Sequence, residues 1–164
     1  MKIETTRFGS QEVEQETILH FPNGLLSNTK GSDPQLKDFK LFHKEETDSE
    51  DEAAIVFWLQ AVDNPDIAYE IMDPSLVNFY YDIALPDEDY DLLESATTDE
   101  IVMMLMISEE KIEQQLEDSN NMAVINANVT EPLFINLNSK KAIHRSIKEL
   151  DYDIFLNIPI VKLN

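Results

Sequence analysis

Short apolar runs recur along the chain, and polar turn-forming residues separate them. Several runs alternate apolar and polar positions or are rich in β-branched and aromatic residues, which is the pattern of β-strands. The spacing of the runs is close and regular, and no run reaches the length of a long helix. The pattern predicts strands at residues 2–8, 17–21, 39–43, 53–62, 67–72, 101–107, 123–129, 133–137 and 142–148.

Turn signals define how these strands connect. Pro22-Asn23-Gly24 follows the second strand, and because Pro presets φ and Gly adopts positive φ without strain, we predict a hairpin turn there. Asn64-Pro65-Asp66 is predicted to close a hairpin between 53–62 and 67–72. Residues 73–80 begin with Asp-Pro and are predicted to form a turn or a short helix.

Two segments have helical patterns. Residues 86–95 begin with Pro and a run of acids, which favour the first turn of a helix. Residues 108–117 are predicted to form one or two helical turns, with Ser108 as the N-cap. Many short strands with one or two short helices indicate a mainly β protein, a small antiparallel β-barrel or a sandwich. We place the barrel domain at 1–148 and a C-terminal extension at 149–164, whose apolar residues should pack on this barrel or on another copy.

Composition narrows the class of protein. With 164 residues and 43% hydrophobic content, the chain can form one domain with its own core. It has no Cys, which excludes disulfides, thiolate metal sites and thiol nucleophiles and suits a reducing cytoplasm. The first residues lack the apolar stretch of a signal peptide, and no apolar run approaches the roughly 20 residues that span a bilayer. We therefore expect a cytoplasmic protein.

The net charge of −21 predicts what the surface attracts. It repels nucleic acid and anionic membranes, and it speeds the encounter with basic partners. A highly soluble or salt-adapted protein would show the same charge. The run 44–52 has no large apolar residue and predicts an exposed, mobile loop, in which Glu45, Glu46 and Asp48 could steer a basic partner.

Motifs of catalysis or cofactor binding do not occur. His20, His43 and His144 lie in separate segments without a zinc-binding spacing, and the three glycines form no phosphate-binding loop. The acidic run 87–91 lacks the Gly and Glu of a calcium loop. We expect no metal, no cofactor and no enzymatic activity. The cations Lys140, Lys141, Arg145 and Lys148 either dock an acidic partner or form salt bridges within the protein.

Five segments in order along the chain match words of one known family. They are HFPNGL (20–25), LQAVDNPDIAYEIMDP (59–74), YDIALPDE (81–88), EIVMMLMIS (100–108) and NANVTEPLFINLNSKKAIHRSI (126–147). Together they resemble the bacterial flagellar assembly factor family, FliW. Within the last segment, Ala142 and His144 depart from the family pattern, which usually has Gly and Gln there.

The resemblance implies a small antiparallel β-barrel and a binding role. Members of the family bind flagellin before its export, and the freed factor binds the RNA-binding regulator CsrA and so relieves repression of flagellin translation. The alternative is a diverged paralogue that acts as a structural or self-assembling adaptor for another client, with a role for its apolar tail. The residues expected at partner surfaces are Phe21, Asn23, Gly24, Asn64, Pro65, Asp66, Asp87, Glu88, Asp89, Asn128 and Pro132.

Overall fold

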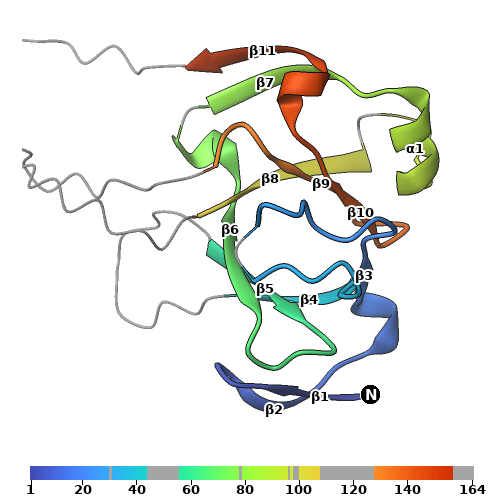
Figure 1. Cartoon of the computed structure of the whole chain (residues 1–164), viewed down its shortest axis with the longest axis vertical. Helices are drawn as coiled ribbons and strands as arrows, with labels where there is room; N and C mark the ends of the chain where they lie inside the picture. Colours follow the sequence, from blue (N-terminus) through green and yellow to red (C-terminus); the bar gives the residue numbers. More distant parts are fainter. Residues whose placement is uncertain are drawn as a thin grey trace, which may run out of the picture.

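A closed β-barrel forms the body of the molecule (Figure 1), and one parallel pair of strands closes an otherwise antiparallel sheet. The computed structural model describes residues 1–29, 31–43, 56–77, 79–95, 97, 100–107 and 128–156. Seven strands close in the order β10-β3-β4-β5-β6-β8-β9, and only the β10–β3 pair is parallel. The prediction of a mainly β barrel is confirmed. The barrel strands are β3 (Leu19–His20), β4 (Asp38–His43), β5 (Val56–Ala61), β6 (Ala68–Met72), β8 (Ile101–Met106), β9 (Leu133–Asn136) and β10 (Lys141–His144).

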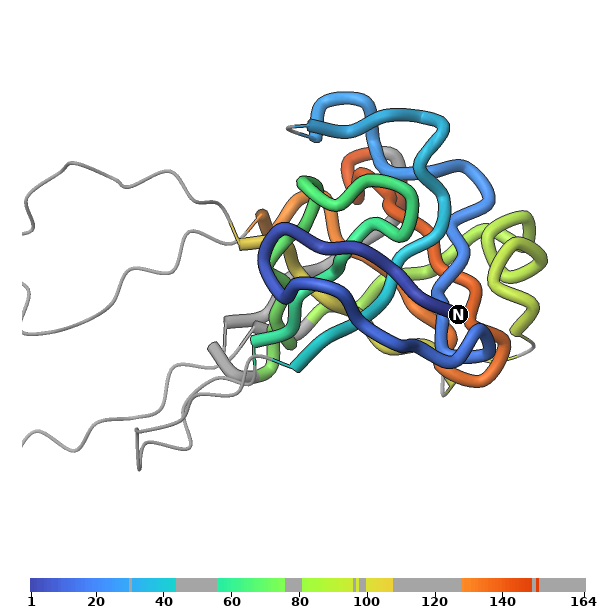
Figure 2. The backbone as a smooth tube through the Cα atoms, turned by 90° about the horizontal axis from the view of Figure 1, so that it is seen from below, coloured from blue at the N-terminus to red at the C-terminus, as the bar shows by residue number. Residues whose placement is uncertain are grey.

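The N-terminal residues form a hairpin across one end of the barrel (Figure 2). It consists of β1 (Lys2–Thr5) and β2 (Gly9–Glu12), so the strand predicted over 2–8 is found but ends at Thr5, and the second strand was not predicted. The chain reverses because Gly9 adopts a φ of +72° and the Thr5 hydroxyl accepts a hydrogen bond from Phe8 N–H at 2.7 Å. Phe8 packs against Phe42 and Trp58, which holds the hairpin on the barrel wall.

A second two-stranded ribbon lies beside the barrel, and neither of its two strands was predicted from the sequence. Pro74–Val77 does form a short 3₁₀ helix, but β7 (Phe79–Ala84) follows it directly. Its partner is β11 (Asp151–Leu156), in antiparallel register from Phe79 opposite Leu156 to Ala84 opposite Asp151. This part of the tail therefore pairs within its own chain, while the domain boundary at 148 stays a prediction.

Other strands are shorter than predicted. The segment 17–21 contains only β3, preceded by a 3₁₀ helix at Gln15–Thr17. The segment 142–148 is a strand only to His144, and a 3₁₀ helix occupies Ile147–Glu149. The predicted strand 123–129 and helix 108–117 lie largely or wholly outside the described residues.

One α-helix, α1 (Asp87–Leu93), follows β7 and packs on β10 (Figure 1), as 86–95 predicted. It begins after Pro86 with three acids in its first turn, a position that the helix dipole favours. Its last residue is Leu93, and Glu94 caps it with a left-handed φ of 51°.

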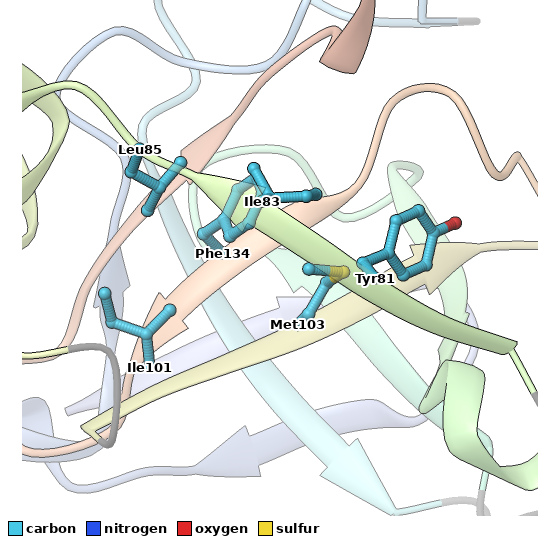
Figure 3. Close-up of a pocket in the computed structure, with 6 residues that line it drawn as sticks. All are labelled: Tyr81, Ile83, Leu85, Ile101, Met103 and Phe134. Atoms are coloured by element: carbon cyan, nitrogen blue, oxygen red, sulfur yellow. The ribbon is translucent and has the colours of Figure 1, made fainter. Parts of the chain in front are cut away.

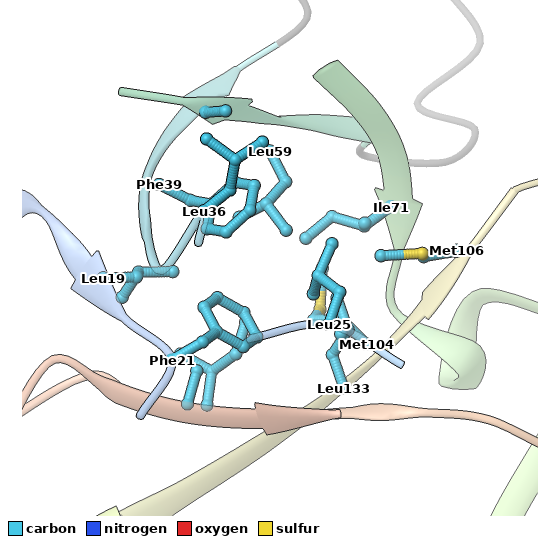
Figure 4. Close-up of a cluster of buried hydrophobic side chains, with 13 residues drawn as sticks. Leu19, Phe21, Leu25, Leu36, Phe39, Leu59, Ile71, Met104, Met106 and Leu133 are labelled. Atoms are coloured by element: carbon cyan, nitrogen blue, oxygen red, sulfur yellow. The ribbon is translucent and has the colours of Figure 1, made fainter. Parts of the chain in front are cut away.

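The core has two parts because β9 is buried on both faces. Leu133 and Ile135 point into the barrel, where thirteen buried side chains pack together (Figure 4). Phe134, between them, points the other way and joins Leu93 and Ile143 in a second cluster. This second cluster also contacts side chains of β7 and β8, so it lies where the ribbon and α1 meet the barrel wall.

Candidate partner-binding site

The turn at Pro22-Asn23-Gly24 is confirmed, but it opens a long loop instead of closing a tight hairpin. Gly24 N–H donates to the Phe21 carbonyl at 3.0 Å, and Gly24 has a φ of +67°. The loop returns when Phe21 N–H bonds to the Lys37 carbonyl at 2.7 Å. Phe21 is fully buried in the barrel core and packs edge-on against Phe39, whereas Asn23 is exposed. Of the three residues expected here at a partner surface, Phe21, Asn23 and Gly24, only Asn23 can present its side chain to a partner.

The second predicted turn, Asn64-Pro65-Asp66, closes the β5–β6 hairpin as expected. Gln60 is fully buried, and its amide nitrogen donates to the carbonyls of Asn64 and Ile67, each at 3.1 Å. The Asn64 side chain accepts a hydrogen bond from Asp66 N–H at 3.0 Å. Pro65 and Asp66 are exposed, but Thr6 in the β1–β2 hairpin bonds to both of them. Thr6 N–H donates to the Pro65 carbonyl at 2.9 Å, and its hydroxyl donates to the Asp66 carboxylate, so the tip of this turn is joined to that hairpin.

The third predicted turn, around Asn128 and Pro132, is joined to the first through side chains. Asn128 accepts hydrogen bonds from Thr130, and its amide nitrogen donates to the Glu131 carboxylate at 2.9 Å. The other oxygen of that carboxylate accepts a hydrogen bond from Asn28 at 2.7 Å. Pro132 is buried. Residues 26–28 and 128–131, far apart in sequence, therefore form one surface.

His144 sits beneath that surface and connects the same two loops. Its Nδ1 accepts a hydrogen bond from Leu26 N–H at 3.1 Å, and its Nε2 bonds to the Glu131 carbonyl at 3.0 Å. These two partners require the neutral tautomer with the proton on Nε2. Burial lowers the pKa of His144 below its ordinary value, although the bond to Glu131 and its carboxylate oppose that effect. The residues next to His144 in the sequence did not predict that it connects two loops.

The predicted acidic residues on α1 divide into two kinds. Asp87 and Glu88 are exposed. Asp89 is buried, and its carboxylate lies 3.1 Å from Nε of Arg145 on the chain after β10. Burial raises the pKa of Asp89, and the Arg145 charge acts in the opposite direction. Asp89 thus attaches α1 to the barrel, and Arg145 follows the expectation of a salt bridge within the protein. Glu45, Glu46 and Asp48 lie outside the described residues.

An apolar groove that sequence reasoning did not find lies between β7 and the barrel wall (Figure 3). It encloses about 150 Å³ and is lined by Tyr81, Ile83, Leu85, Ile101, Met103 and Phe134. The signal was the alternation of Tyr81, Ile83 and Leu85, residues for which no strand was predicted. The Tyr81 hydroxyl donates to the Val129 carbonyl at 2.8 Å, and burial raises its pKa to about 12.

The described residues do not gather into a metal-binding cluster. In this part of the chain no three His, Asp or Glu side chains come close enough to hold a metal ion. The groove is lined by apolar side chains and one tyrosine, which gives it no acid–base pair. Within the same residues no helix is both long and apolar enough to cross a membrane.

Comparison with known proteins identifies relatives along nearly the whole chain. A family model described as FliW protein matches residues 2–155. The flagellar assembly factor FliW of Azoarcus sp. (strain BH72) is 31% identical over 156 residues, which cover 95% of this chain and 97% of the relative. The flagellar assembly factor FliW of Chromobacterium violaceum is 27% identical over 162 residues, covering 97% and 100%. A crystal structure of the flagellar assembly factor FliW shares the fold, with a TM-score of 0.67 and 19% identity over 93% of this chain and 92% of the other.

Proposed function

The chain belongs to the FliW family, and we propose that it acts in flagellar assembly as a non-enzymatic binding protein of the cytoplasm. The observation that carries the proposal is the match to flagellar assembly factors over nearly the full length of both chains. Their name denotes assembly and not a chemical reaction. The surface formed by residues 26–28 and 128–131 and the apolar groove are features through which such a protein can bind partners.

The first proposed partner is flagellin, held before its export. An unassembled filament subunit must expose apolar segments that its neighbours cover in the filament, and a binding protein can shield them. The groove between β7 and the barrel offers apolar contact area for this purpose. In this role the protein is a chaperone.

The second proposed partner is a CsrA-type RNA-binding regulator of translation. Such a protein is basic where it holds RNA, and a chain with a net charge of −21 attracts it over a distance of several ångströms. Once bound, the acidic chain also repels RNA. Binding of flagellin and of the regulator in turn would couple flagellin export to flagellin translation. We expect no direct binding of nucleic acid or membrane.

The alternative of a self-assembling adaptor loses one of its supports. It relied on the apolar tail as a contact between copies, yet residues 151–156 pair with β7 of their own chain. This leaves the adaptor role without a specific observation in its favour.

A pull-down from the lysate of the native host tests the proposal. The tagged chain is incubated with lysate at low and at moderate salt, and the retained proteins are identified. We expect flagellin at both salt concentrations and the regulator mainly at low salt, because salt screens attraction between exposed charges. Retention of some other client, with neither of these two, would contradict the proposal.

A further inference from the structure

The apolar groove is suited to side chains of a protein partner and not to a small cofactor. Its volume of about 150 Å³ is below the roughly 300–1,000 Å³ of typical small-molecule pockets. Its one polar lining group, the Tyr81 hydroxyl, is engaged by the Val129 carbonyl at 2.8 Å. Nothing in the lining would therefore orient a polar ligand. One or two inserted apolar side chains would fill the space.

The dimensions of the groove match a short helix. Tyr81, Ile83 and Leu85 follow one another along one face of the chain, so they span about 14 Å at about 3.4 Å per residue. Two turns of an α-helix cover about 11 Å. Figure 3 shows Leu85 and Ile101 at one end of the groove and Tyr81 at the other. A helix laid along β7 would place apolar residues of successive turns over Met103 and Phe134.

The segment that supplies most of the groove lining is acidic, which favours a basic occupant. Residues 79–107 supply five of the six lining side chains, and this stretch contains no Lys or Arg. At the end marked by Leu85 and Ile101, the exposed acids Asp87 and Glu88 follow Leu85 after Pro86, and exposed Glu100 precedes Ile101. An apolar segment that carries cations at this end is therefore favoured, and an acidic one is repelled.

We propose that this groove is the docking site for an amphipathic helix of a partner protein, with apolar residues inserted between β7 and β8 and Lys or Arg beside Asp87 and Glu88. The proposal rests on the proposed function insofar as the chain acts by binding proteins. It adds the surface, the conformation of the bound segment and its charge. Helices that lay an apolar face into a groove are a common mode of peptide recognition.

Methyl NMR of the full chain with three designed helical peptides tests the proposal. The first peptide has Leu and Phe on one face and Lys at its end, the second replaces Lys with Glu, and the third replaces the apolar face with Ala. We expect the methyl signals of Ile83, Ile101 and Met103 to shift with the first peptide at concentrations below about 1 mM. The second and third peptides should leave them in place. Absence of shifts with the first peptide, or shifts elsewhere only, would overturn the proposal.

Matched charge reversals show whether acids beside the groove or the total charge of the chain determine the affinity for the first peptide. Asp87→Lys with Glu88→Lys should raise the Kd of the first peptide about three- to tenfold. Glu4→Lys with Glu12→Lys changes the net charge equally on the β1–β2 hairpin, at the opposite end of the molecule (Figure 1), and should change Kd by less than about twofold. Equal effects of the two pairs would overturn the proposal. All four residues are exposed, so these variants should fold even where Met103→Lys in the groove does not.

Full-length partners separate failure of this inference from failure of the proposed function. If flagellin or the regulator binds the chain and Met103→Lys leaves that affinity unchanged while the protein stays folded, the groove is not the docking site and the proposed function stands. If neither partner binds but the Lys peptide shifts the groove methyl signals, the docking site is supported and the proposed partners are wrong.

Discussion

His144 on β10 receives a hydrogen bond at Nδ1 from the backbone N–H of Leu26, 3.1 Å away and 118 residues earlier in the chain. Its other ring nitrogen bonds to the Glu131 carbonyl at 3.0 Å. One buried side chain thus satisfies two backbone groups from two different loops. The carboxylate of Glu131 then contacts Asn28 and Asn128, one from each loop. The arrangement explains how the two turn motifs come to form a single surface.

Replacement of His144 should separate hydrogen bonding from packing. His144→Leu leaves a partly buried N–H and a partly buried carbonyl without their partner, and we expect it to lower the free energy of unfolding by about 1–3 kcal/mol. His144→Gln keeps one acceptor and one donor and should cost less. Urea denaturation of both variants provides the measurement. Equal stability of the Leu and Gln variants would show that the two bonds contribute nothing.

The stability of the folded chain should depend on pH through the same imidazole. Burial lowers the folded-state pKa of His144 below 6.5, so the unfolded chain binds the proton more readily. The stability that neutral His144 contributes is complete above the pKa of the unfolded chain, and it is lost as pH falls through the lowered pKa of the folded chain. Lowering the pH from about 7 to about 5 should therefore reduce the free energy of unfolding of wild type more than that of His144→Gln. Parallel pH profiles would contradict this assignment, and His20 and His43 are common to both proteins.

Gly24 should be replaceable by Asn at a lower cost than by Ala. Its φ of +67° is left-handed, which costs a residue with a Cβ about 1–2 kcal/mol, while Asn tolerates that region better. An added Cβ would meet the Pro34 and Leu36 carbonyls at 3.5 Å, an ordinary contact, so backbone strain is the main term. Thermal unfolding of the two variants gives the comparison. If Gly24→Ala were as stable as wild type, the turn would not depend on positive φ.

Charge reversal on α1 should slow association with the regulator. Asp87→Lys with Glu88→Lys removes part of the attraction that steers a basic partner, so the association rate should fall and its dependence on salt should flatten. Stopped-flow measurement at several salt concentrations tests both effects. As a control, Asp89→Asn removes a buried charge that pairs with Arg145, and its expected effect is on stability and not on the association rate. An unchanged rate and salt dependence in the double variant would remove these two acids from the steering.

The sequence predicted those elements whose pattern is local. Strand β4, strand β8 and helix α1 are found where alternation, apolar runs and a proline with acids placed them. The hairpin β1–β2 was missed because the loose alternation of 2–8 continued through the reversal before Gly9. Strand β7 was missed because its only described strand partner, β11, is a segment of the tail whose pairing no local pattern reveals.

The candidate site was predicted in its parts and not in its connections. The turns at 22–24 and 64–66 were found from their Pro, Asn and Gly residues, whose backbone preferences act locally. Asp89 belonged to an acidic run that appeared uniformly exposed, and only the position of Arg145 in the fold distinguishes it. The groove depended on β7 and therefore stayed hidden with it. Contacts across the barrel, such as Leu26 with His144, need the fold to bring their partners together.

Titration of the purified regulator into the purified chain, with and without saturating flagellin, tests the central claim most directly. Isothermal calorimetry gives the affinity in both conditions. We expect stoichiometric binding of the regulator to the free chain, weaker at higher salt, and a marked loss of that binding when flagellin is present. No binding of the regulator to the free chain, or equal binding with and without flagellin, would contradict the proposed coupling of assembly to translation.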